Sequence, residues 1–193
     1  MAFQHAIALT GGIATGKSTA SQWLAQSGLL IIDADTIAHQ ILDEQHATIA
    51  QLFDPSLVIN QKVDRKALGS IVFSDASKRK QLEALLHPLI YQRIQEHAHQ
   101  ADKKQRPYLI DIPLFFETKR YPIKESILVY ATPQQQRQRL MKRDNLTATE
   151  AQKRIDAQMD IDTKRTLATY IIDNQSDLQA LQEACDKIVK LIL

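Results

Sequence analysis

A glycine-rich segment near the start of the chain carries the clearest chemical pattern in the sequence. It reads Gly11-Gly12-Ile13-Ala14-Thr15-Gly16-Lys17-Ser18 and follows the spacing G-x-x-x-x-G-K-[ST] of loops that bind phosphate groups. Glycines let the backbone turn its N–H groups around an anion, and a following helix adds partial positive charge at its first turn. We expect the Lys17 ammonium to reach the terminal phosphates of a nucleotide and the Ser18 hydroxyl to ligate Mg²⁺.

The elements on either side of this segment have the order that a phosphate-binding loop needs. Residues 6–9 form an apolar run that ends at Thr10, and residues 18–24 are predicted to form a helix. A strand therefore leads into the loop and a helix leads out of it. A glycine-rich turn with an incidental lysine would require neither element.

Carboxylates follow the next predicted strand, residues 29–32. Asp33 and Asp35 are two residues apart, so on an extended segment both would face one cleft. A carboxylate there can accept a proton from an attacking hydroxyl or hold Mg²⁺ through water. The alternative is that one of them caps a helix at 36–42, for which Asp35 is the better candidate. Asp111 is either a second carboxylate on the metal side or a buried or capping residue.

Further short apolar runs predict a sheet. They cover residues 108–112, 127–131 and 170–172, each closed by proline or polar residues. Helices are predicted over 77–99 with a break at His87-Pro88, over 133–143, from about 147, and over 177–191. This alternation predicts an α/β fold with a mainly parallel sheet covered on both faces, in which ligands bind beyond the carboxyl ends of the strands.

Arginines gather in the last third of the sequence. They are Arg137, Arg139, Arg143, Arg154 and Arg165. A solvated basic face is the ordinary interpretation. Phosphoryl transfer offers another, because arginine stabilises the charge of the transferring group and a polar lid over 144–163 would exclude water. Arg143 and Arg137 are the stronger candidates, and Arg139 and Arg154 are weaker ones.

Composition limits the class of protein. The chain has 193 residues, 44% hydrophobic and 24% charged, with a net charge of +2, which suits one domain with a small insertion. The small net charge gives no general argument for nucleic-acid binding. The single cysteine, Cys185, excludes an intrachain disulfide. With no long apolar segment and no signal-like start, we expect a cytoplasmic protein that is not bound to a membrane, monomeric or weakly oligomeric.

Several segments in this order resemble bacterial dephospho-CoA kinases over essentially the whole chain. The segments are 9–18, 32–35, Asp64-Arg65, 71–73, 86–88, 113–117 and 172–174. The resemblance implies a three-layer P-loop kinase fold with a five-stranded parallel sheet. It places the core at about residues 1–35, 105–140 and 165–193, a helical CoA-side insertion at about 36–104, and a lid at about 141–164. It also implies ATP-dependent phosphorylation of the ribose 3′-hydroxyl of dephospho-CoA, with Mg²⁺.

The resemblance also assigns roles to individual residues. It makes Asp33 the base, with Lys17 and Arg143 as the other catalytic residues and Ser18 as the metal ligand. Nucleotide binding falls to residues 11–18 with Thr19, Arg137 and Asn174, and acceptor binding to Asp33, Asp64, Arg65, His87, Pro113, Leu114 and Glu117. Thr169 and Ser176 depart from the family pattern on the adenine side.

Three other functions remain open on the sequence. One is a kinase for another small acceptor, such as a nucleoside monophosphate. Another is a GTP-dependent switch, which would need an Asn-Lys-x-Asp segment that the sequence lacks. The last is an inactive nucleotide-binding module. The presence of Lys17, Ser18 and Asp33 argues against it.

Overall fold

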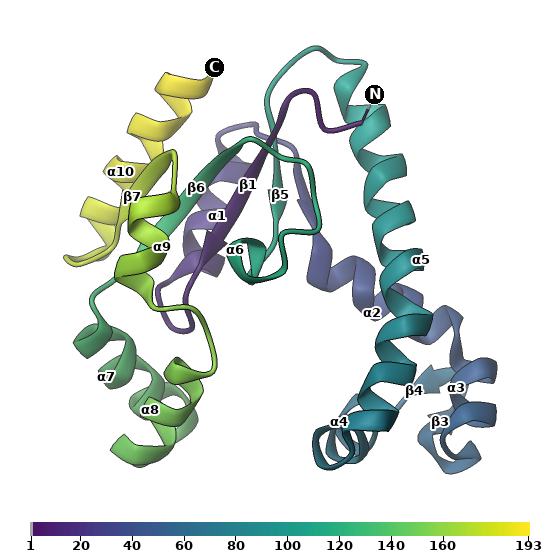
Figure 1. The fold of residues 1–193 in the computed structure, drawn as a ribbon. Helices are drawn as coiled ribbons and strands as arrows, with labels where there is room; N and C mark the ends of the chain where they lie inside the picture. Colours follow the sequence, from purple (N-terminus) through teal and green to yellow (C-terminus); the bar gives the residue numbers. More distant parts are fainter. Residues whose placement is uncertain (1) are drawn as a thin grey trace. The chain divides into compact units, whose positions relative to one another are not determined.

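The computed structural model describes residues 2–193 and divides the chain into two compact units (Figure 1). The first unit contains the residues up to Ile32 together with Ala98–Leu193, and the second contains Asp33–His97. The first is built on a parallel five-stranded sheet in the order β2-β5-β1-β6-β7. The strands are β1 (Ala6–Gly11), β2 (Ile31–Asp33), β5 (Tyr108–Asp111), β6 (Glu125–Tyr130) and β7 (Tyr170–Asp173). The predicted α/β fold with a five-stranded parallel sheet is confirmed.

Burial explains why the central strands read as continuous apolar runs. All six residues of β1 are buried, and so are five of the six in β6, as expected for strands covered on both faces. The register sets Leu9 beside Asp111 of β5 and beside Ile127 of β6. The carboxyl ends of these strands therefore open at one edge. Only the strand predicted at 29–32 is displaced, because β2 begins at Ile31.

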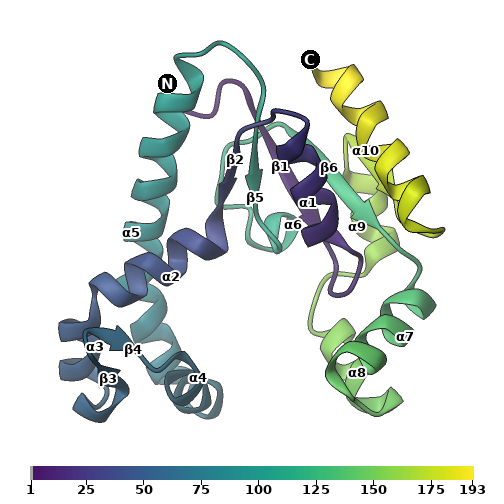
Figure 2. The ribbon, with the colours of Figure 1, turned by 180° about the vertical axis from the view of Figure 1, so that it is seen from behind.

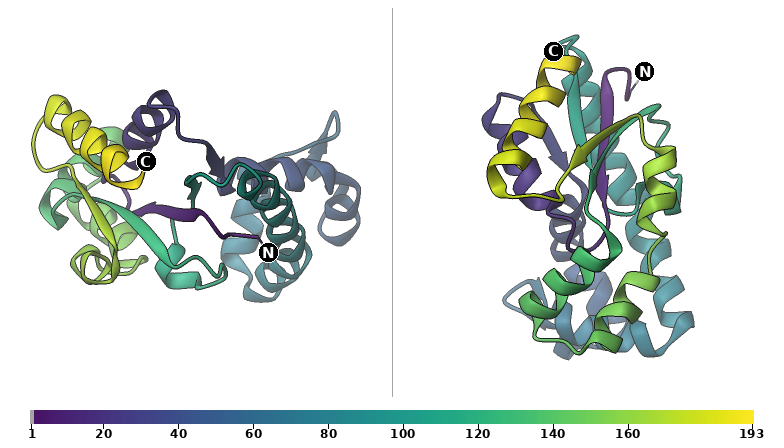
Figure 3. Two further views of the ribbon diagram at one scale, coloured as in Figure 1. Left: turned by 90° about the horizontal axis from the view of Figure 1, so that it is seen from above. Right: turned by 90° about the vertical axis from the view of Figure 1, so that its left-hand side faces the viewer.

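Helices cover both faces of the sheet in the first unit (Figures 1 and 2). α1 (Lys17–Gln26) and α10 (Leu178–Ile192) pack together on one face, and Figure 3 shows them side by side. α9 (Ile161–Leu167) packs against β6 on the other face, where the Tyr130 hydroxyl donates to Asp162 Oδ1 at 2.7 Å. The remaining helices of this unit are α6 (Phe115–Thr118), α7 (Pro133–Asp144) and α8 (Ala148–Asp156).

The second unit is mainly helical. It contains α2 (Ala34–Glu44), α3 (His46–Leu52), a 3₁₀ turn (Pro55–Leu57), the hairpin strands β3 (Val58–Ile59) and β4 (Lys62–Val63), α4 (Arg65–Ser74) and most of α5 (Ala76–Asp102). Its own buried cluster consists of Leu42, Ile49, Leu57, Val63 and Leu68. This separate core explains why the segment forms a compact unit.

The break predicted at His87-Pro88 is wrong, because α5 continues through Pro88 without interruption. Proline removes one helical hydrogen bond, a loss that packing can offset. Leu82, Leu85 and Leu86, in the turns before Pro88, pack against the buried cluster of the second unit. These contacts stabilise the helical turns that precede Pro88, where the lost hydrogen bond would otherwise end α5.

Candidate active site

All three glycines of the phosphate loop, the segment Gly11–Ser18, lie where protein atoms leave no room for a side chain. A Cβ atom on Gly16 would lie 2.2 Å from Asn174 Nδ2, and the backbone there has a φ of +90°. A Cβ atom on Gly12 would lie 2.6 Å from Gln136 Oε1. Side chains from the distant C-terminal part of the chain therefore press directly on the loop backbone.

Hydrogen bonds hold the same loop in place. The Thr15 hydroxyl donates to the Gly12 carbonyl at 2.9 Å and closes the turn. The buried Asn174 amide donates to the Thr15 carbonyl at 2.7 Å, while Arg139 Nη2 donates to the Asn174 carbonyl at 2.9 Å. Asn174, which the resemblance assigns to nucleotide binding, thus also fixes the shape of the loop.

Lys17 is the first residue of α1 and forms an ion pair with Asp111 at the end of β5. The two side chains are 20% and 6% exposed, so Asp111 is the more deeply buried partner. The carboxylate holds the Lys17 ammonium beside the carboxyl edge of the sheet. Nucleotide phosphates would compete with Asp111 for the same cation.

The first turn of α1 offers donors of the kind that Mg²⁺ prefers. Ser18 is exposed there, and Asp111 supplies a carboxylate near Lys17. Hydroxyl and carboxylate oxygens are hard ligands, and Mg²⁺ keeps several waters and binds substrate phosphates as well. Within residues 2–193, no group of three or more His, Cys, Asp or Glu side chains forms a metal site by itself. The residues fit an ion that arrives with a nucleotide.

Asp33 is the last residue of β2 and caps α2, because its side chain accepts a hydrogen bond from Thr36 N at 2.8 Å. Asp35 lies in the first turn of α2. Two predictions were therefore wrong: Asp35 is not the capping residue, and the two carboxylates do not lie on one extended segment. A helix that begins at Ala34 turns successive side chains through about 100°, so Asp33 and Asp35 point in different directions.

Arg137, Arg143 and Arg154 are exposed, whereas Arg139 is partly buried. Asp144 is bound by Arg143 (Nε–Oδ1 2.7 Å) and by Arg154 (Nη1–Oδ2 2.7 Å), and we call these three residues the Asp144 cluster. The hydrogen bond from Arg143 lowers the pKa of Asp144 and raises that of Arg143. The side chain of Arg137 is exposed and makes no hydrogen bond or ion pair with the rest of residues 2–193. Arg139 is the arginine that reaches the loop network.

The residues assigned to the acceptor fall in both units. In the first, the Pro113 carbonyl accepts from Thr10 Oγ1 at 3.0 Å, Leu114 is 40% exposed, and Glu117 pairs with a buried lysine. In the second, Asp64 caps α4 through the N–H groups of the residues that follow, Arg65 is exposed, and His87 is half-buried in α5. Their contact with an acceptor remains a prediction.

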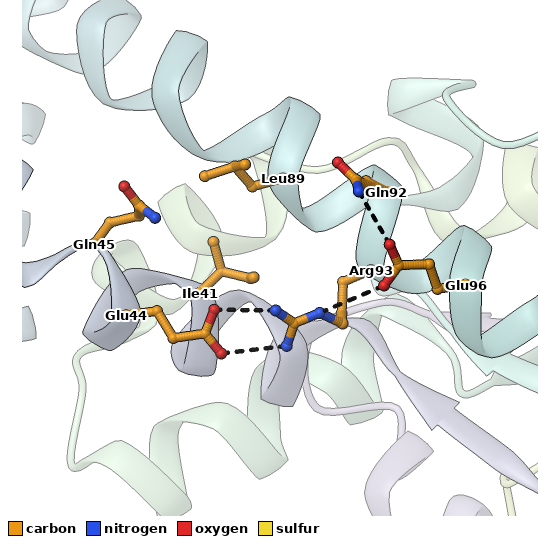
Figure 4. A pocket seen from close by; sticks show the side chains of 7 residues that line it. All are labelled: Ile41, Glu44, Gln45, Leu89, Gln92, Arg93 and Glu96. Atoms are coloured by element: carbon orange, nitrogen blue, oxygen red, sulfur yellow. Dashed lines mark hydrogen bonds and ion pairs between the residues drawn. The ribbon is translucent and has the colours of Figure 1, made fainter.

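The second unit also contains a hollow of about 140 Å³ between α2 and α5 (Figure 4). Arg93 crosses it and pairs with both oxygens of Glu44 at 3.2 and 3.0 Å, which raises the pKa of Arg93. Ligand pockets usually measure about 300 to 1,000 Å³. This hollow is too small for a nucleotide-sized acceptor, and the ion pair within it ties the two helices together.

Comparison with known proteins decides the family. A family model for dephospho-CoA kinases matches residues 5–180. The chain belongs to the dephospho-CoA kinase family. A dephospho-CoA kinase of Sulfurimonas denitrificans is 45% identical over 192 residues, covering 100% of this chain and 96% of the relative. One from Helicobacter pylori strain 26695 is 45% identical over 196 residues and covers 100% of both chains.

Solved structures agree with this assignment. The dephospho-CoA kinase from Campylobacter jejuni superposes with a TM-score of 0.80 at 36% identity, covering 97% of this chain and 96% of that one. A shikimate kinase from Acinetobacter baumannii has a TM-score of 0.52 at 18% identity over 97% of this chain and 92% of that one, which shows the fold alone. The family explains why the phosphate loop is followed by this particular set of segments.

Three residues beside the loop of this dephospho-CoA kinase family member were missed on the sequence. Gln158, Lys164 and Gln136 each contact or approach the loop backbone. Gln158 lies in the polar segment 144–163 that was interpreted as a lid, and the other two were given no role. Both Ile161 and Lys164 are buried on α9. The signal for this in the sequence was their spacing, because residues three apart share one face of a helix.

Proposed function

We propose that this protein transfers the γ-phosphoryl group of ATP to the ribose 3′-hydroxyl of dephospho-CoA, forming coenzyme A and ADP. The observation that carries the proposal is the phosphate loop, whose backbone is set by Asn174 and whose Lys17 already lies at the carboxyl edge of the sheet. Phosphoryl transfer depends mainly on positioning and charge stabilisation, which such a loop supplies. The family membership supplies the acceptor.

The proposed chemistry assigns one task to each side chain. The 3′-oxygen attacks the γ-phosphorus, the bond from that phosphorus to the β,γ-bridging oxygen breaks, and the hydroxyl proton passes to Asp33. Lys17 leaves Asp111 for the phosphates, and Arg143 leaves Asp144 to neutralise charge on the transferring group. Ser18 and Asp111 would hold Mg²⁺, which supplies further charge neutralisation when it is bound with ATP.

Binding roles complete the proposal. Residues 11–18, Thr19, Arg137 and Asn174 would bind ATP, and the acceptor-side residues named from the resemblance would shape the dephospho-CoA site. The single cysteine is consistent with a cytoplasmic protein, and we propose that the protein acts as a monomer or weak oligomer. Among residues 2–193, the helices are too short or too polar to cross a bilayer.

An acceptor panel tests the proposal. ADP release is measured with ATP and Mg²⁺ in the presence of dephospho-CoA, adenosine, AMP or shikimate, with the product of each reaction identified by phosphorus NMR. We expect strong preference for dephospho-CoA, a new 3′-phosphomonoester, and loss of turnover when EDTA removes the divalent ion. Equal rates with AMP or shikimate would show another small-molecule kinase.

A further inference from the structure

Lys164 has no exposed side-chain surface, although its ammonium group is strongly hydrated in water. It lies on α9 with Ile161, which is also buried. Removing a charge from water is costly unless partner groups compensate it closely. The partners of Lys164 therefore indicate why this position carries a lysine.

Two oxygen atoms accept hydrogen bonds from the Lys164 ammonium. Nζ lies 2.6 Å from Glu117 Oε1 and 3.1 Å from the carbonyl oxygen of Gly11. Glu117 belongs to α6, and Gly11 is both the last residue of β1 and the first of the phosphate loop. The ammonium thus joins α9, α6 and the loop through charge-assisted hydrogen bonds, which are stronger than neutral ones.

The bond to Gly11 sets the direction of a peptide group in the loop. Because a trans peptide is planar, the Gly11 carbonyl and the Gly12 N–H point in opposite directions. Lys164 draws the carbonyl toward α9, and this fixes where the Gly12 N–H points. The next peptide along is also fixed from the same region, since Ile13 N donates to Gln158 Oε1 at 2.8 Å.

Glu117 connects these contacts to the segment between α8 and α9. Its Oε1 also accepts a hydrogen bond from Met159 N at 3.1 Å, while its Oε2 is buried and has no hydrogen-bond partner among residues 2–193. The lysine is the main compensation for this carboxylate. Without Lys164, the partly buried carboxylate of Glu117 would keep a single N–H donor, that of Met159.

We propose that Lys164, held by Glu117, is a positioning residue that shapes the phosphate loop for ATP before the nucleotide binds. Its buried ammonium acts through the Gly11 carbonyl and does not touch the phosphates. The proposal rests on the proposed use of this loop for ATP and is independent of the acceptor. The alternative is a purely structural ion pair between α9 and α6.

Four variants separate these two roles: Lys164→Met, Glu117→Gln, the double variant Lys164→Met/Glu117→Gln, and the control Lys187→Met on the exposed side of α10. Calorimetry measures ATP affinity without acceptor, steady-state kinetics measures KM for each substrate, and thermal unfolding measures stability. We expect Lys164→Met to weaken ATP binding at least about tenfold, the scale of a lost hydrogen bond to a charged group. The KM for dephospho-CoA and the behaviour of Lys187→Met should not change.

The double variant is the decisive measurement. It contains no unpaired carboxylate, so its unfolding temperature should recover toward that of the wild type, while its ATP affinity stays low because the Gly11 carbonyl still lacks a donor. Recovery of both stability and ATP affinity would overturn the proposal and leave a structural ion pair. If Glu117→Gln raises only the KM for dephospho-CoA and leaves ATP affinity unchanged, Glu117 has only the acceptor role that the resemblance assigns to it, and its part in shaping the loop is overturned.

The test stands apart from the proposed function. If Lys164→Met does not fold, the double variant is compared directly with the wild type. It lacks the Glu117 carboxylate that Lys164→Met leaves without a cation. A wild-type protein that binds ATP without phosphorylating dephospho-CoA would refute the proposed function and still allow this measurement. A double variant with wild-type ATP affinity would refute only the role of Lys164.

Discussion

The phosphate loop and the Asp144 cluster are both polar, but the structure holds them in opposite ways. Buried partners, Asn174 and Lys164, bind the loop backbone, whereas Arg143 and Arg154 pair with Asp144 while 58% and 51% exposed. Interactions shielded from water keep their strength, and exposed ion pairs contribute little and exchange partners easily. The difference indicates that the fold holds the loop backbone firmly, whereas Arg143 and Arg154 can exchange Asp144 for another anion.

The largest expected effect comes from Lys17. Lys17→Ala should lower turnover by about two to three decades, the scale of losing one group that stabilises transition-state charge. It also leaves the buried Asp111 without its cation. Single-turnover kinetics at saturating ATP measures the effect. Turnover within a few-fold of wild type would mean that the loop does not hold the reacting phosphate.

Asp33 is exposed, like the Asp144 cluster, but should matter as much as the loop. Asp33→Asn removes the proposed proton acceptor while keeping the cap of α2, since asparagine caps helices as well as aspartate does. We expect turnover to fall by about two decades or more with ATP affinity nearly intact. Rapid-quench kinetics measures turnover and ATP titration measures ATP affinity. Near-normal turnover would show that Asp33 is not the base.

Gly16→Ala tests the packing of the loop, and Gly28→Ala is its matched control. Both glycines have nearly the same φ, +90° and +91°, but only Gly16 has Asn174 against the new Cβ atom. The backbone strain of about 1 to 2 kcal/mol is common to both variants. We expect only Gly16→Ala to weaken ATP binding, by about tenfold or more, as expected for a lost hydrogen bond and a shifted loop. Equal ATP affinities would show that contact with Asn174 is dispensable.

Arg143→Ala should separate catalysis from stability. Its ion pair is exposed, so the unfolding temperature should change by at most about 2 °C. Turnover should fall several-fold or more because charge on the transferring group loses a partner. Arg154→Ala, which removes the other arginine from Asp144, is the control. The same loss in both variants would assign the effect to the cluster and not to Arg143.

The smallest effect concerns pH. Hydrogen bonding by Arg143 depresses the pKa of Asp144 below its ordinary value of 3.8 in the folded protein. A depressed carboxylate pKa contributes stability above the unfolded-state value and loses it as pH falls through the folded-state value. We therefore expect the cluster to open only below about pH 4, as seen by NMR titration of the Asp144 carboxyl carbon. An ordinary midpoint would show that the cluster is not formed in solution.

Much of the first unit was predictable because its signals are local. The apolar runs of β1, β5 and β6 are continuous since both faces of these strands are buried, and the capping box of α8 lies within the segment that it caps. Predictions failed where packing decides. Pro88 does not interrupt α5, and Asp35 lies in a helix instead of an extended segment.

The residue types and spacing of positions 11 to 18 are enough to predict a phosphate-binding loop, because glycines let the backbone N–H groups turn inward and the following helix adds positive charge. The sequence also predicted the strand before this loop and the helix after it. The atoms that hold this loop were decided only by tertiary structure. Lys164 and Asn174 lie 153 and 159 residues along the chain from their loop partners, Gly11 and Thr15. Nothing in the sequence around such a distant lysine or asparagine indicates which residue it will contact. Each becomes part of the site only when the sheet and α9 bury it there.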